Sequence, residues 1–600
     1  MKAPRFTQPI IRFFLASIGA VMGAFLAGGA TLDVTVETRW AGEKVQMGKP
    51  YISPIDATAR SIDRLDFLLS NFAVVRADGS FVPLTNSFAF MSLGQERDRV
   101  ILTSVPDGEY RQLRFALGLS PEVNHADPSA YGPEHPLNPT LNGLHWSWQG
   151  GYIFMSLEGY WRLANGTNGG FSYHLGNDSS LRMIEVPIAL RIKNSAKISL
   201  VLQLDRVFGG RRPVAAGEET ASTHSRTNDA LADQLLDNLV QAWDSTAVTT
   251  NTFVPQAVPR YTVVVASNAP LYRFQMPRSF PQPSLPRDNP LTVPGVSLGE
   301  ALFNESGLSI NGRQSCASCH QSSAGFVDAG KRFSRGAEGH EGNRNAMPLF
   351  NLAWQTNFFW DGRARSLREQ VLAPIQNPVE MHATLDLVVT NLVQGGYATA
   401  FEAAFGNPEI TSDRIARALE QYLLTLISGN SKFDRVQAGL EKPTEEEARG
   451  FQLFFTEYDP RHDQYGADCF HCHGGALFSD FGFHNNGLDL EANAADSGRS
   501  AITRRTSDRA KFKTPSLRNV AATGPYMHDG RFNSLEEVVA HYVQGVKRSD
   551  TLDPNLAKHP DGGVPLSRED QRALIAFLKT LTDDRFALPN RDSASVVPQP

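Results

Sequence analysis

Two copies of one short cysteine motif constrain this chain more than any other feature of its sequence. They read Cys316-Ala317-Ser318-Cys319-His320 and Cys469-Phe470-His471-Cys472-His473, and they contain all four cysteines of the 600 residues. In such a motif the two thiols reach the two vinyl groups of one haem, and the histidine that follows meets the iron. We therefore predict two covalent c-type haems with His320 and His473 as proximal ligands. A zinc ribbon would not require a histidine directly after each cysteine pair.

Length and charge limit the architecture and the partners of the chain. Six hundred residues exceed what one core supports, so roughly two to four domains are expected. A net charge of −6 without a basic run argues against a nucleic-acid partner. Four cysteines in this length exclude a disulfide scaffold.

The N-terminus predicts export. Lys2, Arg5 and Arg12 precede an apolar stretch from Phe13 to Leu26, and small residues follow it up to Ala30. This order is typical of a secretory signal peptide, here residues 1–30. A membrane anchor is the alternative, but the apolar run is shorter than the ~20 residues that span a bilayer. A periplasmic location also agrees with covalent haem attachment.

Residues 31–250 predict an N-terminal antiparallel β-sandwich-like domain. Apolar residues alternate along 184–192 and again along 198–204, which gives each segment one buried face. Turn residues such as Ala77-Asp78-Gly79 separate further strands. Residues Asp229 to Trp243 predict an amphipathic helix. The proline-rich stretch 251–290 predicts an extended linker.

The C-terminal half predicts a mostly α region of two cytochrome c-like domains, 291–435 and 436–590. Capping boxes at Ser297–Glu300 and Thr444–Glu447 predict a helix ahead of each haem motif. A final amphipathic helix from Ser567 to Leu581 would close the second domain. The first domain would carry the peroxidatic haem and the second the electron-transfer haem.

The segment from Ser297 to Leu588, about half of the chain, resembles the bacterial dihaem cytochrome c peroxidase superfamily, which includes MauG and MbnH. The matching segments are Arg344-Asn345-Ala346-Met347-Pro348, Phe359-Trp360-Asp361-Gly362-Arg363-Ala364, Asn377-Pro378-Val379-Glu380-Met381, Lys513-Thr514-Pro515-Ser516-Leu517-Arg518-Asn519 and Gly524-Pro525-Tyr526-Met527-His528-Asp529-Gly530. The resemblance implies a peroxide-using enzyme.

Several catalytic residues follow from this resemblance. Trp360 matches the tryptophan that lies between the haems and relays electrons, although a core tryptophan is the structural alternative. Gln370, Pro374 and Glu380 match the distal pocket of the first haem. Glu380 would move a proton between the peroxide oxygens, and its structural alternative is a carboxylate at a helix start. Many members have a distal histidine near the position of His340, but the loop from His340 to Asn345 is shorter here. His340 is either a resting-state ligand or a loop histidine, and we favour the loop histidine, which leaves the first haem open to peroxide.

The resemblance also implies a calcium site and a ligand for the second haem. Asn345, Thr523 and Pro525 match an inter-domain calcium site, in which backbone carbonyls would supply several ligands. Tyr542 stands where many members have a methionine that closes the second haem, and MauG-type enzymes have tyrosine there. A phenolate is a harder donor than a thioether and favours oxidised iron. His541 and Met527 are competing ligands.

Residues 31 to about 245 resemble the MbnP-like family, whose members are usually encoded beside an MbnH-type partner. The matching segments are Leu69-Ser70-Asn71-Phe72, Val123-Asn124-His125-Ala126-Asp127, His145-Trp146-Ser147-Trp148-Gln149, Tyr173-His174-Leu175-Gly176 and Ser222-Thr223-His224-Ser225. Many members carry four cysteines in this domain, and this chain has none there.

In that family an MbnH-type enzyme oxidises a tryptophan to kynurenine, and the product helps to bind copper. The resemblance makes Trp148 and Trp146 candidate targets, with Trp148 preferred, and His125 and His174 candidate copper ligands. His224, His145 and His135 rank below them. Each histidine has a structural alternative as a hydrogen-bonded surface residue, and both tryptophans would also suit a strand face.

Three functional hypotheses follow. The first is a peroxide-driven dihaem oxidase that modifies a tryptophan of its own or a neighbouring copper-binding domain. The second is a conventional cytochrome c peroxidase that removes hydrogen peroxide with electrons from a small cytochrome. The third is a copper-binding electron-transfer protein without catalysis, whose partner would be a small c-type cytochrome or a copper protein.

Overall fold

The computed structural model describes residues 29–53, 55–84, 87–146, 150–226, 228–249, 261–490 and 495–587. The predicted signal peptide therefore lies almost wholly outside the described residues, and so does Trp148. Among the helices of the described ranges, none has the length and apolar character that a bilayer crossing requires.

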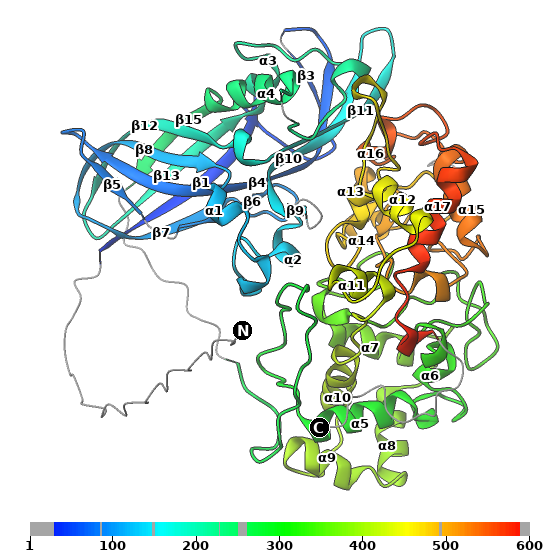
Figure 1. Ribbon diagram of the computed structural model, residues 1–600. Coiled ribbons are helices and arrows are strands. Elements are labelled where there is room, and N and C mark those ends of the chain that lie inside the picture. The colour runs from blue at the N-terminus through cyan, green and yellow to red at the C-terminus, as the bar shows by residue number, and fades with distance from the viewer. Residues whose placement is uncertain are drawn as a thin grey trace, which may run out of the picture.

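The N-terminal domain consists of two sheets (Figure 1). The five-stranded sheet has the order β15-β13-β1-β2, with β7 paired to β1. Its strands are β1 (Ala30–Trp40), β2 (Glu43–Lys44), β7 (Arg99–Val105), β13 (Ser195–Gln203) and β15 (Trp243–Thr249). The ten-stranded sheet has the order β12-β8-β4-β10-β11-β14. Three short strands, β3, β5 and β6, pair with β4, and a fourth, β9, pairs with β10. Its strands are β3 (Pro50–Ile52), β4 (Ala59–Arg76), β5 (Phe81–Pro83), β6 (Ala89–Ser92), β8 (Gly108–Leu117), β9 (His145–Trp146), β10 (Gly151–Arg162), β11 (Asn168–Gly176), β12 (Arg182–Ile192) and β14 (Ser222–Thr223).

The predicted alternation of apolar residues along 184–192 is confirmed. Along β12 every second residue from Ile184 to Ile192 is buried, and the residues between them are exposed. The two sheets share one core, in which the Trp243 ring meets the edge of Phe115 with centroids 5.1 Å apart. The pairing is antiparallel with two exceptions, because β1 runs parallel to β13 and β11 runs parallel to β14.

Four short helices complete this domain, and one of them confirms the predicted amphipathic segment. They are α1 (Pro121–Asn124), α2 (Pro139–Asn142), α3 (Leu204–Gly209) and α4 (Ala230–Val240). Asp229 caps α4 through its side chain, which accepts from the backbone N–H of Ala232.

The proline-rich segment after this domain was predicted as an extended linker, and its described part contacts the first cytochrome domain. Its described part, 261–290, has no regular structure but packs against the first cytochrome domain. Phe280 is fully buried there, and the indole N–H of Trp354 donates to the carbonyl of Pro281 at 2.7 Å. These contacts hold the segment against the first cytochrome domain. The hydrogen bond also pairs the buried indole N–H of Trp354, which would otherwise have no partner away from water.

The two cytochrome domains repeat one helix-packing arrangement. The first contains α5 (Val293–Phe303), α6 (Cys316–Cys319), α7 (Leu367–Gln376), α8 (Leu385–Gln394), α9 (Ala398–Phe405) and α10 (Ser412–Leu424). After α11 (Lys432–Gln437), the second contains α12 (Glu445–Phe454), α13 (Phe470–His473), α14 (Ser500–Thr503), α15 (Leu535–Gln544), α16 (Pro554–Ala557) and α17 (Arg568–Lys579). A Cβ on Gly299 of α5 would lie 2.0 Å from the Ala418 carbonyl oxygen of α10. The same close approach joins Gly450 of α12 to Ala573 of α17, at 1.9 Å.

The predicted helix starts are correct in the second domain and wrong in the first. Thr444 and Glu447 form the expected capping box of α12. In the first domain the helix begins at Val293, four residues before the predicted Ser297. Thr292 is the cap, and Pro294 fits because the first helical turn needs no backbone N–H donors.

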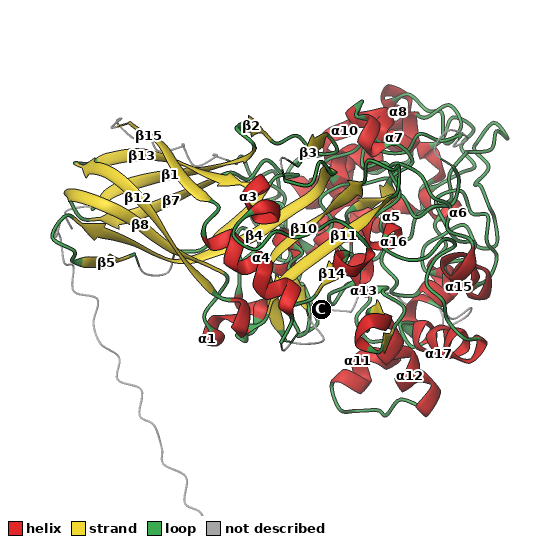
Figure 2. Ribbon diagram, turned by 90° about the horizontal axis from the view of Figure 1, so that it is seen from above, coloured by secondary structure: helices red, strands yellow, loops and turns green. Residues whose placement is uncertain are grey.

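The N-terminal domain docks directly on the second cytochrome domain. Figures 1 and 2 show β10 and β11 lying beside α13 and α16. The Asn555 amide of α16 donates to Glu158 Oε2 of β10 at 3.1 Å. A Cβ on Gly170 of β11 would lie 2.4 Å from the Pro554 carbonyl oxygen, so glycine is what lets strand and helix approach.

Ion pairs whose carboxylate side chains are largely shielded from solvent join the same two domains. Arg226 contacts Glu457 at 3.0 Å and Asp459 at 3.2 Å, and both carboxylate side chains are 3% exposed. Lys511 contacts Asp63 at 2.7 Å. Burying these charges is costly unless the partners stay in place, so the pairs fix the relative position of the domains.

Candidate functional site

Each haem motif presents its histidine in the orientation that an iron ligand needs. His320 Nδ1 donates to the carbonyl of Phe326 at 2.8 Å, and His473 Nδ1 donates to the carbonyl of Phe478 at 3.1 Å. A carbonyl oxygen only accepts, so the ring proton stays on Nδ1 and Nε2 keeps its lone pair. This carbonyl–imidazole arrangement is the one that orients metal-bound histidines.

A cavity of about 560 Å³ opens at the first motif and fits a haem beside Cys316, Cys319 and His320. The residues that the sequence assigned to the distal pocket lie in its wall, namely Gln370, Pro374 and Glu380. Gln370 and Pro374 share one face of α7, where the four-residue spacing brings them together. The structure thus gathers these residues around one reaction space.

Glu380 has the environment of a proton-transfer group. Burial raises the pKa of its carboxyl, while the Asn377 amide and the charge of Arg363 act in the opposite direction. Asn377 Nδ2 donates to Glu380 Oε1 at 2.7 Å and holds the carboxylate in place. A raised pKa brings the carboxyl nearer to neutral pH, where it both accepts and returns a proton.

His340 does not line this cavity. It is exposed on a loop whose turn is closed by the hydrogen bond from Gly336 N–H to the His340 carbonyl. This placement agrees with the interpretation of His340 as a loop histidine.

Trp360 lies at the junction of the two cytochrome domains. Its indole N–H donates to the Asn345 carbonyl at 2.9 Å, and its own carbonyl accepts from the backbone N–H of Lys513. The ring is 8% exposed and forms part of the wall of the first cavity. It therefore links the first cavity to the domain that carries the second motif.

The three candidate ligands of the second haem converge on one residue, Asn486. Its amide donates to the Tyr542 hydroxyl at 3.2 Å and approaches Met527 Sδ at 3.5 Å. His541 Nε2 lies 3.0 Å from the Asn486 carbonyl and is occupied by that hydrogen bond. Burial raises the pKa of Tyr542 to about 12, so the phenol stays protonated unless a cation such as iron binds it.

In the described part of the chain, the side chains of Asn345 and Thr523, two of the residues proposed for calcium, form hydrogen bonds with backbone carbonyls and not with carboxylates. The Asn345 amide faces the carbonyls of Lys331 and Arg332, each at 3.2 Å. Thr523 Oγ1 donates to the Val520 carbonyl at 3.3 Å, next to the cis peptide bond before Pro525. Calcium binding there remains a prediction that relies on backbone oxygens.

Trp146 of the N-terminal domain lies against the second haem motif. It is 3% exposed, and its ring stacks over Gly176, where a Cβ would come within 2.8 Å of the indole. Trp146, Phe470 and His471 all line one cavity of about 490 Å³. Of the two predicted targets, Trp146 is the one that the structure describes.

The two predicted copper ligands occupy different environments. His174 is buried, and burial lowers the pKa of its imidazole to about 4 despite the hydrogen bond from Nε2 to Glu158. It is therefore neutral at physiological pH. His125 is exposed, and its two ring nitrogens face the Gly150 carbonyl and Asp178. His135 stacks on the ring of Tyr131, whereas His145 meets the ring of Tyr152 in a T-shaped contact.

Comparisons with known proteins agree with both halves of this architecture. A family model described as "Di-haem cytochrome c peroxidase" matches residues 294–442, and one described as "MbnP" matches residues 29–225. The methylamine utilization protein MauG of Methylorubrum extorquens is 40% identical over 319 residues, which cover 53% of this chain and 85% of that protein. The chain belongs to the di-haem cytochrome c peroxidase family. It carries an MbnP domain at its N-terminus.

This di-haem peroxidase is also similar to a cytochrome c551 peroxidase and to a solved MauG-like structure. The cytochrome c551 peroxidase of Nitrosomonas europaea is 34% identical over 306 residues, covering 49% of this chain and 82% of that protein. Among solved structures, a MauG-like protein associated with microbial copper homeostasis is 32% identical with a TM-score of 0.47. That match covers 53% of this chain and 99% of the other.

Proposed function

We propose that this di-haem peroxidase uses hydrogen peroxide to oxidise Trp146 of its own MbnP domain to kynurenine. One observation carries the proposal: the docked domain places Trp146 in the wall of the same cavity as Phe470 and His471 of the second haem motif. The substrate side chain and the haem attachment segment are thus held together within one chain.

The chain's own residues have separable tasks in this reaction. Haem, when bound through the two cysteine pairs, supplies the redox chemistry. Glu380 takes a proton from one peroxide oxygen and returns it to the other, which leaves as water. Asn377 fixes the carboxylate in position, and the pocket wall that contains Gln370 and Pro374 confines peroxide beside it.

Trp360 and Trp146 mark the two ends of an electron path. Trp360 joins the first cavity to the second cytochrome domain through its backbone contact with Lys513. Trp146 lines the cavity that Phe470 and His471 of that domain also line. Electrons would pass from Trp146 toward the first cavity along this line, so peroxide and the substrate indole never need to meet.

The overall reaction balances with hydrogen peroxide as the oxidant. Two peroxide molecules accept four electrons and four protons and become four water molecules. The indole supplies these electrons, takes up two oxygen atoms from water as the protons are released, and loses its C2–C3 bond. Hydrolysis of the resulting N-formyl group then releases formate and leaves kynurenine. The protein must therefore be supplied with peroxide but with no external electron donor.

Peptide mass spectrometry of the haem-loaded protein tests this proposal. After peroxide treatment, the peptide with Trp146 should gain the mass change of a tryptophan-to-kynurenine conversion. Trp161→Phe is the matched control, because Trp161 is a buried tryptophan of the same domain in the core between the sheets. It should leave the modification intact, whereas Trp146→Phe should abolish it.

Two other outcomes would replace the proposal. Rapid peroxide turnover with reduced cytochrome c and an unchanged Trp146 peptide would favour a conventional cytochrome c peroxidase. Two haems that do not respond to peroxide would favour an electron-transfer protein without catalysis. We place the protein in the periplasm, because the leading segment has the order of a signal peptide and both haem motifs require covalent attachment.

A further inference from the structure

Lys513 is a buried residue that contacts the segment leading to Trp360. It lies on β19 (Phe512–Lys513), and the residue is 2% exposed. Its Nζ donates to Gln355 Oε1 and to the Asn357 carbonyl. Its backbone N–H donates to the Trp360 carbonyl at 2.8 Å. One lysine therefore holds residues 355–360 at three points, with both its side chain and its backbone.

The same amine lies between aromatic rings from the surroundings of both haem motifs. Nζ is 5.6 Å from the centroid of Phe358 and 5.5 Å from that of Phe481, within the range of a cation–π contact. Phe358 lines the cavity at the first haem motif. Phe481 follows the loop that orients the second proximal histidine, because the Phe478 carbonyl accepts from His473 Nδ1 at 3.1 Å. The amine is therefore placed between the two haem sites.

Backbone hydrogen bonds tie β19 to the loop of the second haem motif. The strand pairs with β18 (Phe483–His484) in antiparallel register. Thr514, the residue after the strand, donates its backbone N–H to the Gly482 carbonyl at 2.9 Å. Ser479 Oγ donates to the Thr514 carbonyl at 2.8 Å. These hydrogen bonds fix the lysine relative to the second motif, while its amine contacts fix it relative to the first cytochrome domain.

The amine has polar partners but no counter-ion. Both of its acceptors are neutral oxygens, and within the described part of the chain Lys513 forms no ion pair. Burying an unpaired ammonium is costly, and burial lowers the pKa of Lys513 to about 7. A residue needed only to hold residues 355–360 could be neutral. A lysine at this position instead places a positive charge that no neighbouring carboxylate cancels.

The charged groups on the elements packed around this amine have partners elsewhere. Asp480 contacts His484 of β18 at 2.9 Å. Asp361 contacts Arg344 at 2.6 Å. Arg499 donates to the Asp361 carbonyl at 2.8 Å. Among the residues that the structure describes, none of these groups pairs with the lysine, so none of them neutralises its charge.

We propose that Lys513 is a positioning residue that makes the bridge between the two haem sites more oxidising. It fixes the segment that carries Trp360, and it places a positive charge beside Trp360 and the second haem site. A positive charge stabilises the reduced form of a neighbouring redox group, because that form carries one more electron. An electron passes through Trp360 from the second haem to the first, so Trp360 loses one electron and regains one. This role is the same for any substrate, so it goes beyond the proposed oxidation of Trp146.

A redox titration of the full-length, haem-loaded protein at about pH 6 tests the effect of this charge. Lys513→Met keeps the apolar stem of the side chain and removes the ammonium. A unit charge roughly 10 Å away, at an effective dielectric constant of about 20, changes an equilibrium constant about tenfold. Tenfold corresponds to about 59 mV for one electron, and the potential of the second haem should fall by about this amount. Lys579→Met removes an exposed lysine of α17 and should leave the potential unchanged.

The pH dependence separates the charge from a purely structural role. The ammonium is present below its pKa of about 7 and is lost above it, so the wild-type potential should fall between about pH 6 and pH 8. Lys513→Met should lack this fall, and Lys513→Arg should keep the high potential at about pH 8, because arginine stays charged.

A second variant keeps the test decisive if Lys513→Met does not retain haem. Gln355→Met keeps the lysine but removes one of its acceptors, so the fall in potential should move to lower pH. Equal potentials of wild type and Lys513→Met at about pH 6 would overturn the proposal. So would a pH dependence that neither Lys513→Arg nor Gln355→Met changes. These readouts need neither peroxide nor Trp146, so their outcome is separate from that of the proposed oxidation.

Discussion

Replacement of Glu380 by glutamine isolates proton transfer in the peroxide pocket. The amide cannot accept a proton, but its Oε1 still accepts the 2.7 Å hydrogen bond from Asn377, so the geometry of the site is retained. Burial raises the pKa of Glu380, which makes the carboxylate a stronger base than an exposed glutamate. The substitution therefore removes the chemistry and leaves the wall of the cavity in place.

The expected loss is ~10²- to 10⁴-fold in the second-order rate constant for the reaction of ferric protein with peroxide. This corresponds to about 3–5 kcal/mol of activation free energy. The pH dependence has a definite sign. The base must be ionised, so the wild-type rate falls as pH decreases through the pKa of Glu380. This decrease in rate, the acid limb of the pH profile, should occur above the pKa of ~4.3 of an ordinary glutamate, because burial raises the pKa of Glu380.

Stopped-flow absorption of the haem bands after mixing with peroxide measures both effects. Glu380→Gln should react slowly and lose the acid limb. Glu402→Gln is the control, because Glu402 is an exposed residue of α9 outside the cavity. A Glu380→Gln protein that reacts at the wild-type rate, with the same acid limb, refutes the assignment of Glu380 as the proton-transfer group.

Three further predictions concern the second cytochrome domain. Lys558→Met removes the buried cation that Glu457 and Asp468 share. It should reduce the free energy of unfolding by about 3–5 kcal/mol in denaturant titrations, whereas the exposed substitution Lys442→Met should not. Burial would raise the pKa of Glu457, but His224 and Lys558 hold it well below its usual range. Stability should therefore fall as pH drops below about 4 and the carboxylate protonates, which thermal melts would show. Tyr542→Met should raise the reduction potential of the second haem in a redox titration, because a thioether ligand stabilises ferrous iron more than a phenolate ligand does. An unchanged potential would show that Tyr542 is not a ligand of this haem.

The local parts of the fold were predictable from sequence because local chemistry determines them. The haem motifs fix covalent bonds, and the capping box at Thr444 uses residues three apart on one helical turn. The helix start at Ser297 was wrong because Thr292 caps the chain earlier, and a proline two residues later fits the first turn. Period-two alternation predicted the strands but not the parallel pairing of β1 with β13, which depends on long-range topology.

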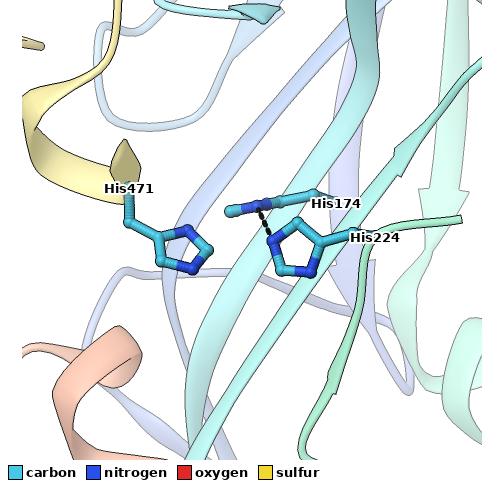
Figure 3. A group of neighbouring side chains, drawn as sticks. All are labelled: His174, His224 and His471. Atoms are coloured by element: carbon cyan, nitrogen blue, oxygen red, sulfur yellow. Dashed lines mark hydrogen bonds between the residues drawn. The ribbon is translucent and has the colours of Figure 1, made fainter. Parts of the chain in front are cut away.

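The interface could not be predicted, because it joins segments more than two hundred residues apart. His471 was visible as one of the two residues between the cysteines of the second motif, but nothing in the neighbouring sequence showed that it lies beside His174 and His224 (Figure 3). The orientation of Trp146 toward this motif depends on a glycine at 176, on a different strand. The resemblance to two families suggested that the N-terminal domain and the peroxidase region act together. Only the arrangement of the docked domains shows which side chains are in contact.

A mixing experiment tests most directly whether the chain oxidises its own domain. Unlabelled wild-type protein is treated with peroxide together with isotope-labelled Glu380→Gln protein, and the two Trp146 peptides are distinguished by mass. Because docking places each Trp146 against the second haem motif of its own chain, kynurenine should form in the unlabelled peptide alone, at a rate independent of protein concentration. Equal conversion of both peptides, or conversion of neither, would contradict the account.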